Sequence, residues 1–321
     1  MPNKIFHTPP LGNLSDTAQA HADSPQTQTQ AIDAAPAAAP KTRKAAVPKI
    51  PDIPMPPAYR VTPLARYNGA STLNGQADKW RTQAMRSHRT PSLIWFTRGQ
   101  GRFTVSGITR GFGPHNLVYL PPRTMYGFDP IGQISGYSVH LPQTEQNDLP
   151  DEPLHLRFTE VIQQNEITGL IEGLAREIDS TQPGHDRALA LQAGMISVWL
   201  ERQMSVMPEY ELTPDASRRL VAAYTALVEA QFRDGHNVSH YAAALGVTPT
   251  HLTRACNIAN GHPASKILAD RVHFEARRML KETDLPVKDI ASKLGFHSPA
   301  YFSRAFQKTT GTSPRKYRHA R

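Results

Sequence analysis

The spacing of apolar residues divides the 321-residue chain into regions of different predicted structure. Between residues 59 and 142, apolar residues alternate with polar ones or form short runs that Gly and Pro separate. This pattern is typical of β-strands. Between residues 158 and 206 they recur every three or four positions, which indicates amphipathic helices. The helical spacing returns after residue 214 and continues to the end of the chain.

Six short segments of the first region are predicted to be strands. The segment Arg98-Gly-Gln-Gly101 is predicted to be a tight hairpin turn, because glycine adopts the backbone conformations that such turns require. Many short strands at regular spacing predict a β-barrel or a β-sandwich. The predicted strands are Tyr59–Thr62, Trp80–Met85, Leu93–Thr97, Arg102–Ser106, Asn116–Leu120 and Gly136–His140.

Residues 158–207 are predicted to form a helical hairpin, because Pro183-Gly184 interrupts two apolar stripes. The hairpin has two interpretations: its helices either only cover the barrel, or they also form a dimerisation arm. The second stripe is wider than packing on a single face requires, which keeps the dimerisation arm open as a hypothesis.

Residues 1–57 contain 11 Pro and 11 Ala but a single aromatic residue, Phe6. Such a segment buries too little apolar surface to offset the entropy lost on ordering, so it is predicted to be a disordered tail. The predicted fold class is therefore α+β with several domains. They are the tail (1–57), a β domain (58–157), the helical hairpin (158–207), a linker (208–214) and an all-α domain (215–321).

The all-α domain contains one short element twice. Each copy has an apolar helix, a Gly, a hydroxyl residue followed by Pro, and a second helix. The hydroxyl residues, Thr248 and Ser298, are predicted to cap the second helices and, because helix N-termini attract anions, to lie near phosphate groups. This arrangement is a helix-turn-helix, whose second helix can enter a DNA major groove. Four residues of the first copy recur 49 positions later: Val238, Ala242, Leu245 and Gly246 match Val287, Ala291, Leu294 and Gly295.

The basic residues of the chain gather in the same domain. Residues 211–321 contain 17 Lys and Arg against 9 Asp and Glu. The difference, 17 − 9, gives this region a net charge of +8, out of +9 for the whole chain. Such an excess is expected of a surface that faces a polyanion. Arg254 and Arg304 occupy equivalent places in the two copies, which favours a shared contact with guanine or phosphate.

The two helix-turn-helix units, with the helix predicted between them at Pro263–Lys281, resemble the AraC/XylS family of transcriptional regulators. The resemblance implies a seven-helix domain whose two recognition helices enter successive major grooves. It also implies which residues face the bases: Thr250, Thr253 and Arg254 in the first recognition helix, and Pro299, Ala300, Ser303 and Arg304 in the second. The segments that carry it are Gly261–Ile267, Val287-Lys-Asp-Ile-Ala, Leu294-Gly-Phe296, Tyr301-Phe-Ser-Arg-Ala-Phe306 and Gly311-Thr-Ser-Pro-Arg-Lys-Tyr317-Arg318.

The chain departs from the family pattern in both recognition helices. Cys256 stands where an aromatic residue is common, and it is expected to be a small buried thiol rather than a redox switch. Pro299 and Ala300 offer few donors to base edges. Base reading by the second helix is therefore expected to depend on Ser303 and Arg304 and on contacts with thymine methyl groups.

Residues 89–142 resemble, less specifically, the cupin-like β-barrel sensor domain that commonly precedes this DNA-binding unit. The resemblance rests on Leu93–Val105 and on Asn116-Leu-Val-Tyr-Leu-Pro-Pro122. It implies a small effector held inside the barrel, which changes dimer geometry or interdomain contacts. Most aromatic residues of the strands are expected in the core, and the candidates for lining an effector pocket are Trp95, Phe103, Tyr119, Tyr126 and Tyr137.

The 14 histidines raise an alternative, a cupin-type enzyme fused to a DNA-binding module. A metal-binding cupin needs paired histidines on neighbouring strands. Here the nearest equivalents are His88 and Tyr126, while His115 and His140 each stand alone in their segments. We therefore predict no metal, no cofactor and no catalytic residue. A third hypothesis, an architectural DNA binder, predicts equal affinity for unrelated duplexes, whereas a regulator prefers its site by about 10³-fold or more.

The sequence thus predicts a sequence-specific, DNA-binding transcriptional regulator modulated by a small effector. The expected partners are promoter or operator DNA, an effector of unknown identity, a second copy of the chain and, if the protein is an activator, RNA polymerase. The chain has one cysteine, no apolar run near the ~20 residues that span a bilayer, and no secretory signal pattern. These features predict a cytoplasmic protein without membrane contact.

Overall fold

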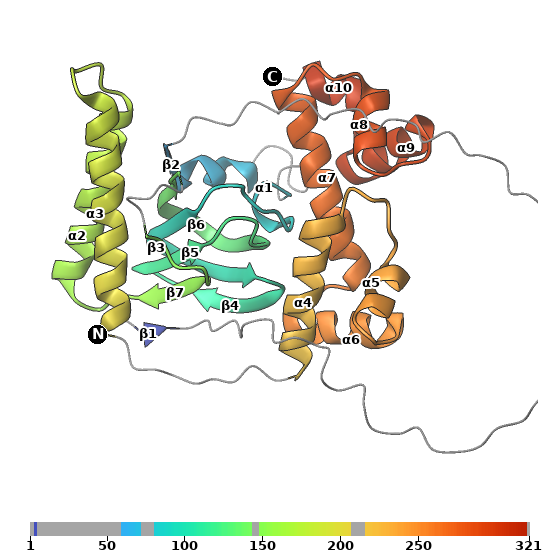
Figure 1. Ribbon diagram of the computed structural model, residues 1–321, viewed down its shortest axis with the longest axis horizontal. Coiled ribbons are helices and arrows are strands. Elements are labelled where there is room, and N and C mark those ends of the chain that lie inside the picture. Colours follow the sequence, from blue (N-terminus) through green and yellow to red (C-terminus); the bar gives the residue numbers. More distant parts are fainter. Residues whose placement is uncertain (1–2, 5–58, 72–79, 143–147, 207–215, 320–321) are drawn as a thin grey trace, which may run out of the picture. The chain divides into compact units, whose positions relative to one another are not determined.

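The computed structural model describes residues 3–4, 59–71, 80–142, 148–206 and 216–319 (Figure 1). Most of the predicted tail and the whole predicted linker lie outside these residues. Within them, seven strands form one antiparallel sheet in the order β1-β7-β5-β3-β6-β2, with β4 paired to β3. The strands are β1 (Asn3–Lys4), β2 (Arg60–Pro63), β3 (Ser92–Val105), β4 (Ile108–Phe112), β5 (Asn116–Leu120), β6 (Tyr126–His140) and β7 (Leu154–Arg157).

The long strands β3 and β6 form the centre of the sheet. The predicted hairpin turn at Arg98–Gly101 is wrong, because these residues continue β3. Two register shifts in the pairing of β3 with β6 accommodate them within the strand. The chain instead reverses at Ser106-Gly107, where Val105 pairs with Ile108 and both turn residues have positive φ. Two such residues make the tight turn that matches the twist of a hairpin.

Three other sequence predictions differ from the structure. Trp80–Met85 is not a strand: α1 (Trp80–Gln83) begins there, and only Arg86 forms a bridge, to Tyr126. Strands β1, β4 and β7 were not predicted, and the 3-10 helix η2 (Leu64–Ser71) follows β2. Asn3 and Lys4 pair with β7, so at these two residues the prediction of a disordered tail is wrong.

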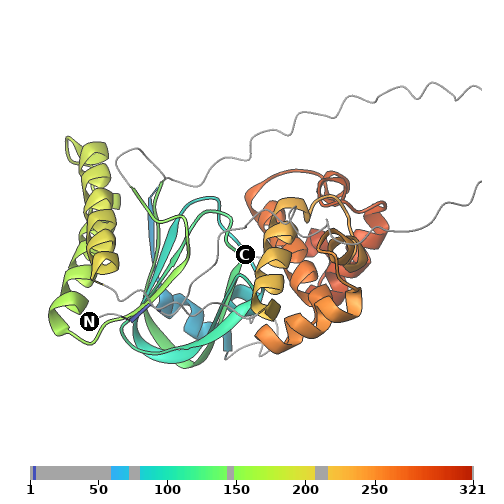
Figure 2. The ribbon, with the colours of Figure 1, turned by 60° about the horizontal axis from the view of Figure 1, so that its bottom comes forward.

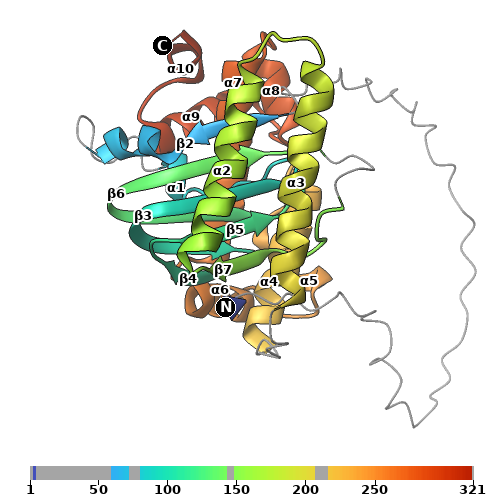
Figure 3. The same cartoon turned by 90° about the vertical axis from the view of Figure 1, so that its left-hand side faces the viewer.

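The two faces of the sheet carry separate apolar clusters, because successive strand residues point to opposite sides. On β3, Leu93 and Trp95 belong to the cluster shared with α2 (Val161–Ile178) and α3 (His185–Ser205), whereas Ile94 belongs to the cluster on the other face. Helices α2 and α3 form the predicted hairpin and lie side by side over one face of the curved sheet (Figures 2 and 3).

Residues 216–319 form an all-α domain of seven helices, as the family resemblance implies, and the α+β prediction is confirmed. No helix in the described part of the chain is both long and apolar enough to cross a membrane. The helices are α4 (Ala216–Gln231), α5 (Val238–Ala244), α6 (Pro249–Asn260), α7 (Ala264–Glu282), α8 (Val287–Lys293), α9 (Pro299–Thr310) and α10 (Pro314–His319).

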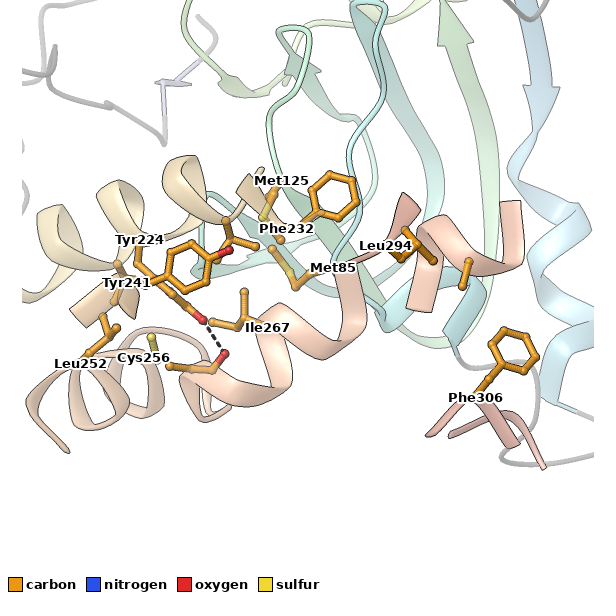
Figure 4. Close-up of a cluster of buried hydrophobic side chains, with 14 of the residues drawn as sticks. Met85, Met125, Tyr224, Phe232, Tyr241, Leu252, Cys256, Ile267, Leu294 and Phe306 are labelled. Atoms are coloured by element: carbon orange, nitrogen blue, oxygen red, sulfur yellow. Dashed lines mark hydrogen bonds between the residues drawn. The ribbon is translucent and has the colours of Figure 1, made fainter. Parts of the chain in front are cut away.

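One apolar cluster forms the core of the all-α domain, and Figure 4 shows part of it. Within it the buried hydroxyl of Tyr224 donates a hydrogen bond to the carbonyl oxygen of Ala264 at 2.8 Å, which joins α4 to the start of α7. Two methionines of the β domain are buried in the same cluster: Met85, which follows α1, and Met125, which directly precedes β6. The core of the all-α domain therefore includes side chains of the β domain.

The turn between β3 and β4 makes a second contact with the helices. Asn260, the last residue of α6, donates its side-chain amide to the carbonyl oxygen of Gly107 at 3.0 Å. A Cβ atom on Gly107 would overlap the side chain of Val221 on α4. The close approach requires glycine, and it couples the hairpin of the sheet to both α4 and α6.

Candidate nucleic-acid interface

The first helix-turn-helix consists of α5, a short turn and α6. The side chain of Asn237 caps α5 by accepting a hydrogen bond from the backbone N–H of His240 at 3.1 Å. The hydroxyl oxygen of Thr248 caps α6 in the same way, accepting from the N–H of His251 at 3.2 Å. Pro249 occupies the first turn of α6, where a missing N–H costs nothing.

The second unit, α8 and α9, repeats this geometry. The hydroxyl of Ser298 accepts from the N–H of Tyr301 at 3.5 Å and caps α9, and Pro299 opens the helix. Both recognition helices end at a glycine in the left-handed conformation, Gly261 and Gly311. The predicted caps are therefore present at both N-termini, where each satisfies a backbone N–H that has no partner within the helix.

Each recognition helix has one buried face and one outward face. Leu252 and Cys256 of α6 are fully buried, and so are Phe302 and Phe306 of α9. The opposite side of each helix points outward, because positions three and four apart share a helix face. All seven predicted base-facing residues lie on the outward faces: Thr250, Arg254, Pro299, Ala300 and Arg304 are exposed, and Thr253 and Ser303 are partly exposed.

The two arginines are free to contact a ligand. Among the described residues, neither Arg254 nor Arg304 takes part in an ion pair or a side-chain hydrogen bond, although salt bridges occupy Arg271 and Arg278 of α7. An unpaired guanidinium on an outward helix face is suited to bidentate contacts with guanine or phosphate. Cys256 lies beneath this face, and burial raises the pKa of its thiol to about 12.

Helix α7 connects the two units and carries a buried network of charges. Arg271 donates from Nε to Glu229 of α4 at 2.6 Å and from a terminal nitrogen to Glu275 at 3.2 Å, and it lies 3.8 Å from the ring centre of Phe232. Glu275 also accepts from Arg233 and Arg278, each at 2.7 Å.

The charges around Glu275 keep it ionised. Burial alone would raise the pKa of this carboxyl, but the hydrogen bond from Arg278 and the charges of Arg271, Arg278 and Arg233 outweigh burial. Together they hold its pKa well below the ordinary value. Because Arg233 follows α4 and Glu275 lies on α7, the network fixes these two helices to each other.

The five candidates for an effector pocket do not lie together. Trp95, Tyr119 and Tyr137 belong to or pack against the cluster under α2 and α3, whereas Phe103 and Tyr126 lie on the opposite face of the sheet. The first three are also held by hydrogen bonds, to Thr168, Pro150 and Glu172 respectively. A single pocket lined by all five is therefore excluded, because a β-strand alternates its side chains between two faces.

The structure brings together a histidine pair that sequence reasoning did not connect. The rings of His88 and His140 lie 4.5 Å apart, His88 Nε2 lies 2.6 Å from the hydroxyl of Tyr126, and His140 Nδ1 lies 2.9 Å from the hydroxyl of Ser92. Burial, and next the charge of Arg60, lowers the pKa of His140 to about 4. The pairing of Ser92 with His140 in the sheet is a long-range contact that no local pattern reveals.

This pair does not complete a metal site. Among the described residues, no group of three or more His, Cys, Asp or Glu side chains is placed to hold a metal ion. The positively charged neighbours of His88 also include Arg86 and Arg271, which disfavour a cation.

Comparisons with known proteins point to DNA-binding regulators. Residues 241–320 match a family model described as a helix-turn-helix domain. The probable transcription factor PqrA of Proteus vulgaris is 33% identical over 88 residues, which are 27% of this chain and 72% of PqrA. The arabinose operon regulatory protein of Salmonella typhimurium is 26% identical over 170 residues, 53% of this chain, and the match spans only 56% of that regulator.

Among solved structures, apo ToxT from Vibrio cholerae aligns with 81% of this chain and 97% of its own, with a TM-score of 0.40 and 13% identity. The relatives by sequence are thus transcription factors or transcriptional regulators by name, and the alternative of a cupin-type enzyme gains no support from them.

Proposed function

Because the chain belongs to the AraC/XylS family of transcriptional regulators, we propose that it binds specific DNA sites through α6 and α9 and regulates transcription there. The observation that carries the proposal is the pair of equivalent recognition helices. Each is capped by a hydroxyl residue, packed on one face and outward on the other, with an unpaired arginine at the same position. If the protein activates transcription, RNA polymerase is a further partner.

The test is selection of a duplex from a random pool by the full chain, followed by Arg254→Ala and Arg304→Ala. Each substitution is expected to weaken binding to the selected duplex by about 1–3 kcal/mol, roughly 5- to 150-fold, and to affect a scrambled duplex much less. Arg202→Ala, an exposed arginine on α3, controls for loss of charge alone. If both duplexes lose affinity equally, the two arginines contact phosphate and do not read bases.

We further propose that the β domain holds a small effector on the face of the sheet opposite α2 and α3, where Phe103 and Tyr126 lie. The β3–β4 turn, Met85 and Met125 all contact the all-α domain, so a ligand that shifts this face would shift α4 and α6.

A thermal-shift screen of small metabolites tests the proposal of an effector on this face. A hit is expected to lose its stabilising effect in Tyr126→Phe and to keep it in Tyr119→Phe, a buried tyrosine of the other face. The opposite result would reject the assignment.

A dimer is proposed through α3. Leu191, Met195 and Val198 recur at helical spacing, and their side chains are exposed although α3 buries its other face on the sheet. An exposed apolar stripe of this kind is typical of an interaction surface. Sedimentation equilibrium is expected to show a dimer that Met195→Glu dissociates. Asp186→Lys, a charge reversal at an exposed residue of α3 that lies off this stripe, is expected to leave the dimer intact, and a dimer that survives Met195→Glu would contradict this interface.

A further inference from the structure

The loop between α4 and α5 lies directly against the turn of the second helix-turn-helix. Gly235 of the loop and Gly295 of the turn both have positive φ, +74° in each case. A Cβ atom on Gly235 would overlap the carbonyl oxygen of Gly295, and a Cβ atom on Gly295 would lie 2.6 Å from the carbonyl oxygen of Arg233 and from the Cα of Gly235. The two backbones approach closely enough that only glycine fits on either side.

The first helix-turn-helix provides an internal comparison. Gly246 occupies the position in the first repeat that Gly295 occupies in the second, and its φ of +68° is nearly the same. A Cβ atom on Gly246 would meet nothing within 4 Å. The turn itself therefore needs glycine for its φ at both places, but the close contact exists only at Gly295.

The loop that contacts Gly295 is fixed at both of its ends. Phe232, just before it, is buried in the core of the all-α domain, and Arg233 donates to Glu275 of α7 at 2.7 Å. Two residues beyond Gly235, Asn237 caps α5, the first helix of the first unit. A displacement of the second unit at Gly295 would therefore move the start of the first unit.

Helix α7 fixes the separation of the two units by its length, but this length does not fix their relative rotation. Its 19 residues fix the distance between them, because an α-helix rises 1.5 Å per residue. Rotation of the second unit about the end of α7 is not fixed by that length. A second contact away from the helix axis restricts this rotation.

We propose that the contact between Gly235 and Gly295 is a positioning element that fixes the relative orientation of the two recognition helices and thereby the spacing of the DNA segments they bind. The inference rests on the proposed DNA binding. Gly235 and Gly295 act through α6 and α9 and touch no DNA themselves.

The test uses asparagine substitutions in the full chain, because asparagine tolerates positive φ while adding the Cβ atom that the contact excludes. Gly235→Asn and Gly295→Asn are expected to weaken binding to the selected duplex by about 10-fold or more, since the second unit no longer docks at a fixed position. They are also expected to broaden the dependence of affinity on single base-pair insertions between the two half-contacts. Gly246→Asn is the matched control and is expected to keep the wild-type affinity and spacing profile.

A distance measurement tests the contact without DNA. Spin labels at Asn257 and Gln307, exposed positions at equivalent places on α6 and α9, are introduced with Cys256 replaced by Ala. The distance distribution is expected to be narrow in the parent and in Gly246→Asn, and broad or shifted in Gly235→Asn and Gly295→Asn. Unchanged distributions and spacing profiles in both variants would overturn the proposal.

A second pair of variants covers the case in which the asparagine variants do not fold. Arg233→Gln frees the loop from Glu275 and adds no atom at the contact, whereas Arg278→Gln removes another partner of Glu275 and leaves the loop attached. Only Arg233→Gln is expected to broaden the distance distribution, and equal effects would overturn the proposal. If the wild-type chain selects no duplex, the proposed function fails, while the label distances still decide whether the contact orients the helices.

Discussion

At the scale of single residues, Glu275 accepts hydrogen bonds from three arginines while its side chain is only 4% exposed: Arg271 and Arg278 on its own helix and Arg233 after α4. Glu275→Gln is expected to lower the free energy of unfolding by about 3 kcal/mol, the lower end for breaking a buried ion pair, because Arg233 and Arg278 retain access to water. Urea unfolding measures this loss. Glu282→Gln, at a side chain that is 52% exposed, is the control and is expected to cost less than about 1 kcal/mol. Equal losses would show that the network contributes no more than a surface pair.

Cys256 illustrates how position in the core sets reactivity. Its side chain is fully buried, and burial raises the pKa of its thiol to about 12. The folded protein at pH 8 is therefore expected to react with iodoacetamide at least about 10³-fold more slowly than an ordinary cysteine, because so little thiolate is present. Mass spectrometry of the alkylated chain, with and without urea, measures this. Rapid alkylation of the folded protein would contradict a purely structural thiol.

At the scale of elements, α7 determines how the two units use DNA together. If it is a rigid connection, the units bridge two major-groove segments about one turn, roughly 10 bp, apart. Inserting about 5 bp between the half-contacts is expected to abolish most specific affinity, because one contact then faces the opposite side of the duplex. Inserting about 10 bp restores the face but exceeds the reach of the helix, so binding is not expected to recover. Gel-shift titrations on the three duplexes decide this, and full recovery at the longer spacing would reject a rigid connection.

Strand β3 shows why local signals fail where pairing is long-range. Gly99 and Gly101 predict a turn when the sequence is considered alone, yet β6 pairs along nearly the whole of β3 and accommodates both glycines through register shifts. Turn propensity is a weak preference, and the twelve residues of β3 that pair with β6 outweigh it. The helix at Trp80–Gln83 shows the same limit, since its alternating pattern is compatible with a strand, but the segment meets the sheet only after its end, where Arg86 bridges to Tyr126.

At the scale of the whole molecule, stability is expected to fall in mild acid. Burial is the largest cause that lowers the pKa of four histidines: to about 4 for His140 and His273, to about 3 for His155, and well below 6.5 for His88. The arginines nearest these rings, among them Arg86, Arg110 and Arg277, lower the pKa further. Each histidine is thus neutral in the folded state and protonated in the unfolded state between its folded pKa and about 6.5.

The sign of the pH dependence follows from this difference. The unfolded state binds more protons as the pH falls below 6.5, so stability is fully present above that pH and is lost toward pH 4, by up to about 1.4 kcal/mol per pH unit for each histidine. Urea unfolding between pH 7 and pH 5 measures the slope before most carboxylates titrate. His273→Gln is expected to reduce the slope of unfolding free energy against pH by the contribution of one histidine. A free energy of unfolding that stays constant over this range would contradict the prediction.

The sequence by itself determined the all-α domain. Its main features depend on residues three or four positions apart: the helices, the caps at Thr248 and Ser298, the buried thiol and the outward arginines. The tandem repeat contains this local pattern twice. Only the tertiary structure decided which face of the sheet each aromatic residue occupies, that His88 meets His140, and that Gly235 lies against Gly295. The two named contacts join residues 52 and 60 positions apart (140 − 88 and 295 − 235). The close approach at Gly295 but not at Gly246 depends on what the folded chain places beside each turn.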